Sequence, residues 1–254
     1  MAQITAPLGI AAKPAKRLPG RRYDHVFFTV MAVAMFLTAF AGFARTYFLA
    51  GMFRAPLPSL IVHIHGAAFT SWVVLLVVQT SLVSAGRTDI HRSLGVAGFL
   101  LGCLMVVLGI LAATDSLVRA ATVAAPGGRD AKAFYIVPLT DMLIFVVCLY
   151  SAFRARFNPS AHKRYIYIAT TALLIAAIAR LPLSFGSRRV LVAALLTNIF
   201  LLILVAYDWW STRTIHRATL WAGAFLIFVQ QVRLPIGRSA AWHAFAAWVQ
   251  THAR

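Results

Sequence analysis

The sequence contains no glutamate, and its six acidic residues are all aspartates. Only 12% of its 254 residues are charged, whereas 61% are hydrophobic and the mean hydropathy is +0.81. A soluble domain of this length does not need so few charges, so the composition indicates an integral membrane protein. The sequence also lacks a phosphate-binding glycine loop, a nucleophile elbow and paired carboxylates, which argues against the enzyme classes that depend on them.

Cysteine is scarce too, and a leader peptide is not evident. Cys103 and Cys148 both lie within apolar runs, so we expect small buried hydrophobic residues rather than a disulfide. The first residues are rich in Pro, Ala and Lys, without an apolar core ahead of the basic cluster, which predicts no cleaved signal peptide. Residues 1–22 are therefore expected to form a flexible basic tail.

Positive charge exceeds negative charge, giving a formal net charge of +18. The Lys and Arg fall mostly between long apolar runs, which is typical of loops facing anionic lipid headgroups, so we expect a lipid bilayer and no nucleic acid as the partner. With seven spans, 13 of the 24 basic residues lie on the side of the amino terminus. The positive-inside rule then predicts a cytoplasmic amino terminus and a periplasmic carboxyl terminus in a bacterial inner membrane.

Seven stretches are long and apolar enough to cross a bilayer, which needs about 20 residues. We predict an all-α membrane bundle, within a transmembrane domain of residues 23–237, whose spans lie at about 26–44, 59–84, 93–114, 133–153, 163–182, 190–207 and 217–235. The remaining segment, 238–254, is too short to span. Because Trp242, Phe245 and Val249 share one helical face, we predict an interfacial amphipathic helix there.

Two of these spans repeat a pattern. Residues 162–182 and 216–235 each open with a histidine and a basic residue and close with Arg-Leu-Pro. The first, third, fifth and seventh spans all begin near a histidine, namely His25, His91, His162 and His216. A two-helix unit duplicated in parallel would produce this pattern, and so would a chance match of ordinary interfacial His-Arg pairs.

Polar side chains within the spans are the candidate functional residues, because an ionisable residue at membrane depth usually faces the bundle interior or a polar cavity. His65 and Asp141 lie at similar depths below the outer face, and Arg180, Gln230 and Arg233 approach the same layer from the other direction. This layer is either a purely structural network or a pocket for a small polar or anionic ligand. The predicted pocket residues are His65, Trp72, Gln79, Asp141, Arg180, Gln230 and Arg233.

The segment "HIHG" places two histidines close together in the second span. Residues two apart on a helix point about 200° from each other, so His63 and His65 are not expected to share a metal. His65 continues along a stripe through Phe69, Trp72 and Gln79, whereas His63 is predicted to be interfacial. Gly66 is expected to allow a close approach by a neighbouring helix.

Other functions remain open at this stage. His91, His162 and His216 could ligate haem b or a metal, which would make the chain a haem- or quinone-associated redox or assembly protein. A third alternative is an accessory subunit of a larger membrane complex. A retinal Schiff base is excluded because the last span contains no lysine. The sequence also lacks the late His-x-x-x-His pair that would indicate a metal-dependent membrane hydrolase.

The block "HIHGAAFTSWVVLLVVQTSLVSAGRTDIHRSLGVAGFLLG" resembles a group of bacterial inner-membrane proteins of uncharacterised activity. The likeness rests on a core of His-x-His-Gly, Trp, Gln, Gly-Arg and His-Arg-x-Leu-Gly. The later segments "AHKRYIYIATTALLIAAIARLP" and "AYDWWSTRTIHRATLWAGAF" are similar to the same group, so the resemblance covers about residues 22–250. It implies a multi-pass fold and no specific activity. Similarity to b561-like, haem-handling membrane proteins is an architectural analogy only.

Overall fold

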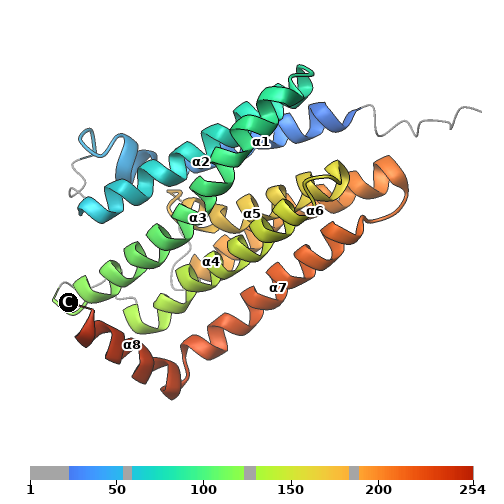
Figure 1. Cartoon of the computed structure of the whole chain (residues 1–254). Helices are drawn as coiled ribbons and strands as arrows, with labels where there is room; N and C mark the ends of the chain where they lie inside the picture. The colour runs from blue at the N-terminus through green and yellow to red at the C-terminus, as the bar shows by residue number, and fades with distance from the viewer. Residues whose placement is uncertain (1–22, 54–58, 123–129, 183–188, 254) are drawn as a thin grey trace, which may run out of the picture.

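The computed structural model describes residues 23–53, 59–122, 130–182 and 189–253, and the predicted tail, 1–22, lies outside them (Figure 1). These ranges contain eight α-helices and no strand. The helices are α1 (Asp24–Phe43), α2 (Leu60–Ser84), α3 (Thr88–Arg119), α4 (Ala131–Arg154), α5 (Pro159–Ile178), α6 (Arg189–Thr212), α7 (Arg217–Gly237) and α8 (Ala240–His252), with a π-helical segment, η2 (Ala44–Phe48), directly after α1.

Six helices are long and apolar enough to cross a membrane, namely α1 with η2, α2, α3, α4, α6 and α7, which indicates a multi-pass membrane protein. The prediction of seven spans is not confirmed, because α5 is not among the six. Its first two turns carry His162, Lys163 and Arg164, which lower its hydropathy. It packs against α1, α4, α6 and α7, and 12 of its 20 residues are buried. A helix enclosed by other helices needs no apolar surface for lipid.

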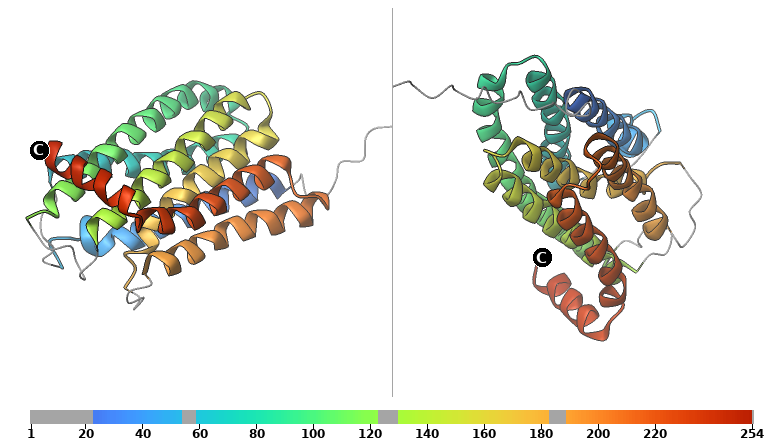
Figure 2. Two further views of the ribbon diagram at one scale, coloured as in Figure 1. Left: turned by 90° about the horizontal axis from the view of Figure 1, so that it is seen from below. Right: turned by 90° about the vertical axis from the view of Figure 1, so that its right-hand side faces the viewer.

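The long helices lie side by side along one axis, with α8 set across one end of the bundle (Figures 1 and 2). Since successive helices alternate in direction, α1, α3, α5 and α7 all begin at the same end. We call this end the histidine face, because the four predicted histidines lie within or next to these helix starts, and the other end the opposite face.

Local side chains define several helix starts. The carboxylate of Asp130 accepts hydrogen bonds from the backbone N–H groups of Lys132 and Ala133 at 3.0 and 3.1 Å. Asn158 caps α5 in the same manner through Ala161, and Pro159 follows it at the first helical position. Such caps satisfy backbone donors that a helix start would otherwise leave without a partner.

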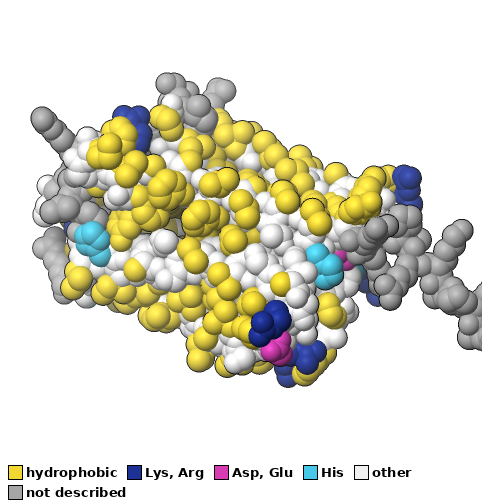
Figure 3. Space-filling model, turned by 90° about the horizontal axis from the view of Figure 1, so that it is seen from above, with side chains coloured by type: hydrophobic (Ala, Val, Ile, Leu, Met, Phe, Trp, Pro, Cys, Tyr) yellow, Lys and Arg dark blue, Asp and Glu magenta, His cyan; other side chains and the backbone are white. Residues whose placement is uncertain are grey.

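Surface side chains agree with a lipid environment. The visible face in Figure 3 is mostly hydrophobic and carries few Lys and Arg. Along α3, exposed apolar residues recur at spacings of three and four, so they form one continuous outward stripe of Val96, Leu100, Leu104, Val107 and Leu111. A helix facing water would place polar residues on such a stripe.

Helix α8 folds back on the ends of α3 and α4. Ala246 is fully buried, with Trp242 and Val249 packed beside it. The Phe245 ring lies 5.4 Å from the Trp242 ring, between centroids, and is 45% exposed. The Trp242 Nε1–H donates to the backbone oxygen of Lys132 at 2.8 Å, which fixes the rotation of the helix and turns Phe245 outward.

The cysteines are both free, as predicted, but only Cys148 is buried. Cys103 is exposed, because it lies on the outward side of α3. The expectation of two buried thiols is therefore wrong for Cys103, since an apolar run within a membrane helix contains lipid-facing positions as well as core positions.

We predict that Gly42→Ala destabilises the bundle. A Cβ atom at this position would clash with the carbonyl oxygen of Ala177, so α1 and α5 would have to separate. Overpacking of this kind costs about 1–3 kcal/mol, which thermal unfolding in detergent would measure. The matched control is Gly95→Ala, where the nearest atom, Nε2 of Gln79, is at an ordinary 3.6 Å. Equal unfolding temperatures for the two variants would contradict this account of the α1–α5 contact.

Candidate functional site

Two arginine–aspartate pairs are buried in the bundle, and the first belongs to the predicted pocket. Arg233 on α7 donates from Nη1 to Oδ1 of Asp141 on α4 at 2.7 Å. Arg233 is only 1% exposed and Asp141 is 7% exposed. The structure thus joins two of the residues that the sequence placed at one depth, and the pairing neutralises both charges in the apolar interior.

The rest of the Arg233 guanidinium has no hydrogen bond to the described residues. Its Nε and Nη2 atoms are buried and have no acceptor among the described residues. These two nitrogens form one edge of the planar group, which can donate two parallel hydrogen bonds to a pair of oxygens. A buried donor without a partner costs about 1–3 kcal/mol, and more when it is charged. The vacant edge is therefore a feature that requires an explanation.

Two hydrogen-bonded amide side chains lie on α6 and α7. Gln230 precedes Arg233 by three residues on α7, so the two side chains share a helix face. Its Oε1 accepts a hydrogen bond from Nδ2 of Asn198 on α6 at 2.9 Å. The Oδ1 atom of Asn198 is buried and has no partner among the described residues. The region therefore offers two unused donor atoms and one unused acceptor atom.

The second buried pair, Arg164 with Asp208, makes an instructive comparison. Arg164 is 3% exposed and Asp208 is fully buried. Arg164 donates from Nε at 2.9 Å and from Nη2 at 2.5 Å to Oδ1 of Asp208. Its Nη1 donates to the backbone oxygen and Oγ of Ser160. The edge that is vacant in Arg233 is thus occupied by a carboxylate in Arg164.

Asp208 is equally well satisfied. Its Oδ2 accepts hydrogen bonds from Oγ1 of Thr219 at 2.6 Å and from the backbone N–H of His216 at 3.1 Å. The pair therefore joins α5, α6 and the start of α7 without an unused charged group. A network in which every member is bonded is structural in character.

A further ion pair lies close by at the histidine face. Lys163 Nζ contacts Oδ2 of Asp24 at 2.5 Å, and the Tyr207 hydroxyl donates to Oδ1 of Asp24 at 2.7 Å. These bonds tie α1 to α5 and α6. Sequence reasoning missed both pairs at this face, since it used Lys163 and Arg164 only in the count of basic residues on the side of the amino terminus. The only available signal was Asp208 directly after the predicted end of the sixth span, at residue 207.

The remaining pocket residues do not join Asp141 and Arg233. Trp72 donates from Nε1 to Oγ1 of Thr170 at 3.1 Å, in the core between α2 and α5. The His65 ring contacts Phe69 at a centroid distance of 4.2 Å and lies beside the backbone carbonyl of Leu108. Its Nδ1 is buried without a partner among the described residues.

Arg180 is exposed at the end of α5. Its Nη1 donates to the backbone oxygen of Ala176 at 2.7 Å, and its guanidinium lies 4.7 Å from the centroid of the Phe43 ring on α1. Arg180 and Arg233 therefore have different environments, although both stand in the repeated Arg-Leu-Pro segment. Of the seven predicted pocket residues, the structure brings Asp141 and Arg233 into contact, and Gln230 precedes Arg233 by three residues on α7.

The histidines and Gln79 lie elsewhere. With its amide oriented to suit its neighbours, Gln79 donates to Nδ1 of His91 at 2.8 Å and accepts from the backbone N–H of Gly95. The rings of His91 and His162 have centroids 6.3 Å apart, and Nδ1 of His162 is 2.9 Å from the backbone oxygen of Ala152. His216 instead caps α7, its Nδ1 accepting from the Ala218 N–H. Within the described residues, no three His, Cys or Asp side chains are grouped to hold a metal.

The "HIHG" pair separates as predicted. His63 is exposed, and its Nδ1 lies 3.4 Å from the hydroxyl of Tyr47 in η2. Gly66 lies against the Tyr47 ring, where a Cβ atom would come within 2.9 Å of it. The close approach expected at Gly66 is thus made by a tyrosine side chain.

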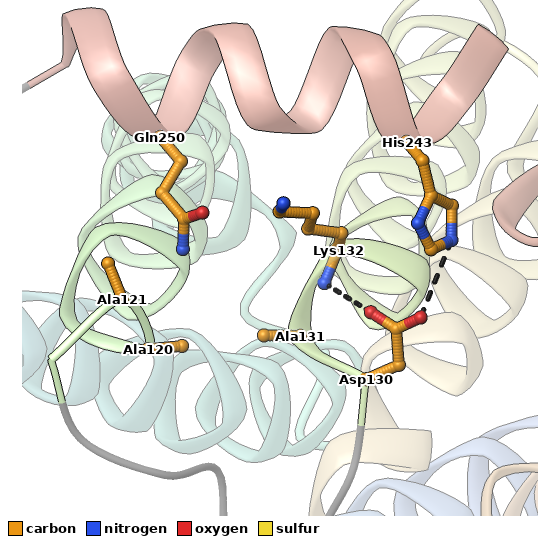
Figure 4. Close-up of a pocket in the computed structure, with 7 residues that line it drawn as sticks. All are labelled: Ala120, Ala121, Asp130, Ala131, Lys132, His243 and Gln250. Carbon is orange, nitrogen blue, oxygen red and sulfur yellow. Dashed lines mark hydrogen bonds and ion pairs between the residues drawn. The ribbon is translucent and has the colours of Figure 1, made fainter. Parts of the chain in front are cut away.

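A cavity of about 410 Å³ opens at the opposite face, under α8 (Figure 4). Asp130, Lys132, His243 and Gln250 line it, and Nε2 of His243 is 3.4 Å from Oδ2 of Asp130. The Gln250 amide donates to the backbone oxygen of Leu117 at 2.7 Å, so two of the lining residues already hold α8 in place. The lining carries both signs of charge and does not include Arg233.

We predict that Asp208→Asn strongly destabilises the protein. The substitution leaves the buried Arg164 charge without its counterion, which costs about 3–5 kcal/mol. The control is Asp115→Asn, whose partner Arg119 is half exposed, so the expected cost is at most about 1 kcal/mol. Thermal unfolding of the purified variants measures both. Similar losses of stability would show that the Arg164 pair does not hold the helices together.

A second prediction concerns pH. Burial lowers the pKa of His216 below its ordinary value of 6.5, and the Arg164 charge lowers the pKa further, against the opposing effect of Asp208. The folded protein therefore favours the neutral ring, and stability is lost as the pH falls below the unfolded-state value. Between about pH 7.5 and about pH 5.5, His216→Asn, which caps a helix without titrating, should show a smaller fall in unfolding temperature than the wild type. Identical pH profiles would refute this role of His216.

Comparison with protein-family models, curated proteins and solved structures found no match to the chain. The family resemblance based on the "HIHG" block therefore stays a prediction, and the functional argument depends on the geometry alone.

Proposed function

We propose that the protein binds or transports a small polar or anionic ligand held by the free edge of Arg233. The supporting observation is the contrast between two arginines of similar burial. Arg164 directs its Nε and Nη2 atoms at a carboxylate, whereas the same atoms of Arg233 have no acceptor among the described residues. The missing partner of Arg233 is thus expected to resemble the one that Arg164 has.

The unused atoms define the ligand. Two adjacent oxygens, as in a carboxylate, match the Nε and Nη2 edge of Arg233 in bidentate geometry. A donor group on the ligand, such as a hydroxyl, would satisfy Oδ1 of Asn198. Asp141 holds the guanidinium in place through Nη1 and offsets its charge, so binding of the ligand requires no rearrangement of the pair.

The position of Arg233 along α7 suggests from which side of the membrane a ligand would reach it. Thr219, in the satisfied network, and Arg233 are 14 residues apart on α7, or about 21 Å at 1.5 Å per residue. The hydrocarbon core of a bilayer is about 30 Å thick, so it would have room for both arginine–aspartate pairs, one near each border. Arg233 is therefore nearer the opposite face. We propose that this face is periplasmic in a bacterial inner membrane, since the modest excess of basic residues favours a cytoplasmic histidine face.

The proposal predicts that Arg233→Lys abolishes ligand binding without unfolding the protein. Lysine retains the charge that pairs with Asp141, but it cannot present two parallel donors to a carboxylate. Thermal unfolding with acetate, lactate, succinate and inorganic phosphate should identify a compound that stabilises the wild type, by about 2.7 kcal/mol at a concentration 100 times its dissociation constant. This shift should disappear in Arg233→Lys.

Arg180→Lys is the matched control, because Arg180 is exposed and bonds within its own helix. It should keep the full ligand-induced shift. The proposal fails if none of the compounds stabilises the wild type, or if Arg233→Lys responds as strongly as Arg180→Lys.

A second candidate function has one observation in its favour. The rings of His91 and His162 lie 6.3 Å apart, and Nδ1 of His162 donates to the backbone oxygen of Ala152, which is how the ring orientation of a histidine ligand is usually fixed. This pair supports a haem-associated redox protein. Purified protein would then show Soret absorbance that His162→Ala removes, and a spectrum without it would contradict this candidate.

A further inference from the structure

A second cavity, of about 540 Å³, lies at the histidine face, where the start of α5 meets the connection between α6 and α7. Its polar side chains are those of Asn158, Tyr165, Thr214, His216 and Arg217. It is separate from the Arg233 site, which lies near the other end of α7. It also differs in kind from the cavity under α8, because no acidic side chain lines it.

The lining of this cavity is rich in hydrogen-bond donors. The Asn158 side chain uses Oδ1 to cap α5, which leaves its NH₂ group to donate. His216 uses Nδ1 to accept from the Ala218 N–H, so its ring proton is on Nε2. No described residue accepts from either group.

Arg217 and Tyr165 add to this set. The Arg217 side chain is exposed, and its guanidinium has no acceptor among the described residues. The Tyr165 hydroxyl likewise has no acceptor among the residues that the structure describes. Four donor groups of one cavity are therefore unused, and Arg217 is the one that carries a formal charge. A ligand that suits them must be rich in acceptor oxygens and negatively charged.

The position of the cavity indicates where such a ligand comes from. The connection between α6 and α7 joins two of the helices that are long and apolar enough to span a membrane, so we expect it at the level of the lipid headgroups. Trp209, Trp210 and Trp221 near this end are more than half exposed, as aromatic residues at a membrane interface commonly are. The phosphodiester groups of the bilayer lie at this level.

We propose that the cavity formed by Asn158, Tyr165, His216 and Arg217 binds the phosphodiester headgroup of an anionic phospholipid. The phosphate oxygens accept from the four donor groups, with Arg217 supplying the charge. A zwitterionic headgroup is disfavoured, because its ammonium group would find no carboxylate in the lining. The site is independent of the Arg233 site, so either can be tested without the other.

The experiment measures thermal unfolding of the full chain in detergent, with added dioleoyl phosphatidylglycerol, dioleoyl phosphatidylcholine or inorganic phosphate. Phosphatidylglycerol should raise the unfolding temperature of the wild type by about 3 °C, with little effect from the other two. Arg217→Gln should lose this rise. Arg92→Gln is the matched control, since Arg92 is also exposed at the histidine face but does not line the cavity.

Three outcomes overturn the proposal. One is a wild type that phosphatidylglycerol does not stabilise, and another is an equal rise in Arg217→Gln and Arg92→Gln. The third is full stabilisation by inorganic phosphate alone, which would assign the cavity to a free anion.

If Arg217→Gln does not fold, Tyr165→Phe removes one donor at constant shape. Native mass spectrometry should then find less phosphatidylglycerol retained by Tyr165→Phe than by the wild type, and equal retention counts against the site.

Discussion

The structure depends on how a guanidinium group is accommodated in an apolar interior. Each arginine carries five N–H donors and a charge that burial does not remove, so it needs a counterion and several acceptors. Arg164 finds both in Asp208 and Ser160, and this cluster fixes the positions of α5, α6 and the start of α7. Arg233 finds a counterion in Asp141, but its Nε and Nη2 find no acceptor in the part of the chain that the structure describes. The bundle is thus closed by a satisfied network at one end and an unsatisfied one at the other.

This asymmetry connects architecture to function. Helix α5 has the charged residues of the satisfied network in its first turns, and it can carry them because other helices enclose it. Helix α7 contributes to both ends, since Thr219 belongs to the complete network and Arg233 to the incomplete one. A membrane protein that retained a buried charge only for packing would be expected to bond all of it, as at Arg164. Under the proposed function, the ligand binds at this edge of Arg233.

Much of the fold could be predicted from the sequence, because lipid-facing helices must be apolar over about 20 residues. The prediction of seven spans is not confirmed at α5, which packs against several other helices, and the exposure of Phe245 depends on a Trp242 hydrogen bond that the spacing does not show. For the site, depth alone correctly grouped Asp141 with Arg233. Pairing across the bundle, as in Arg164 with Asp208, requires knowledge of helix rotation that spacing along one chain does not supply.

The most direct measurement is an experimental structure of the purified protein at a resolution that shows ordered water around Arg233. Our account predicts planar density larger than a water molecule, within hydrogen-bonding distance of both Nε and Nη2, with Asp141 still bonded to Nη1. Single water molecules on these two nitrogens, or an Asp141 carboxylate rotated onto them, would contradict it. In either case Arg233 would be a structural residue like Arg164.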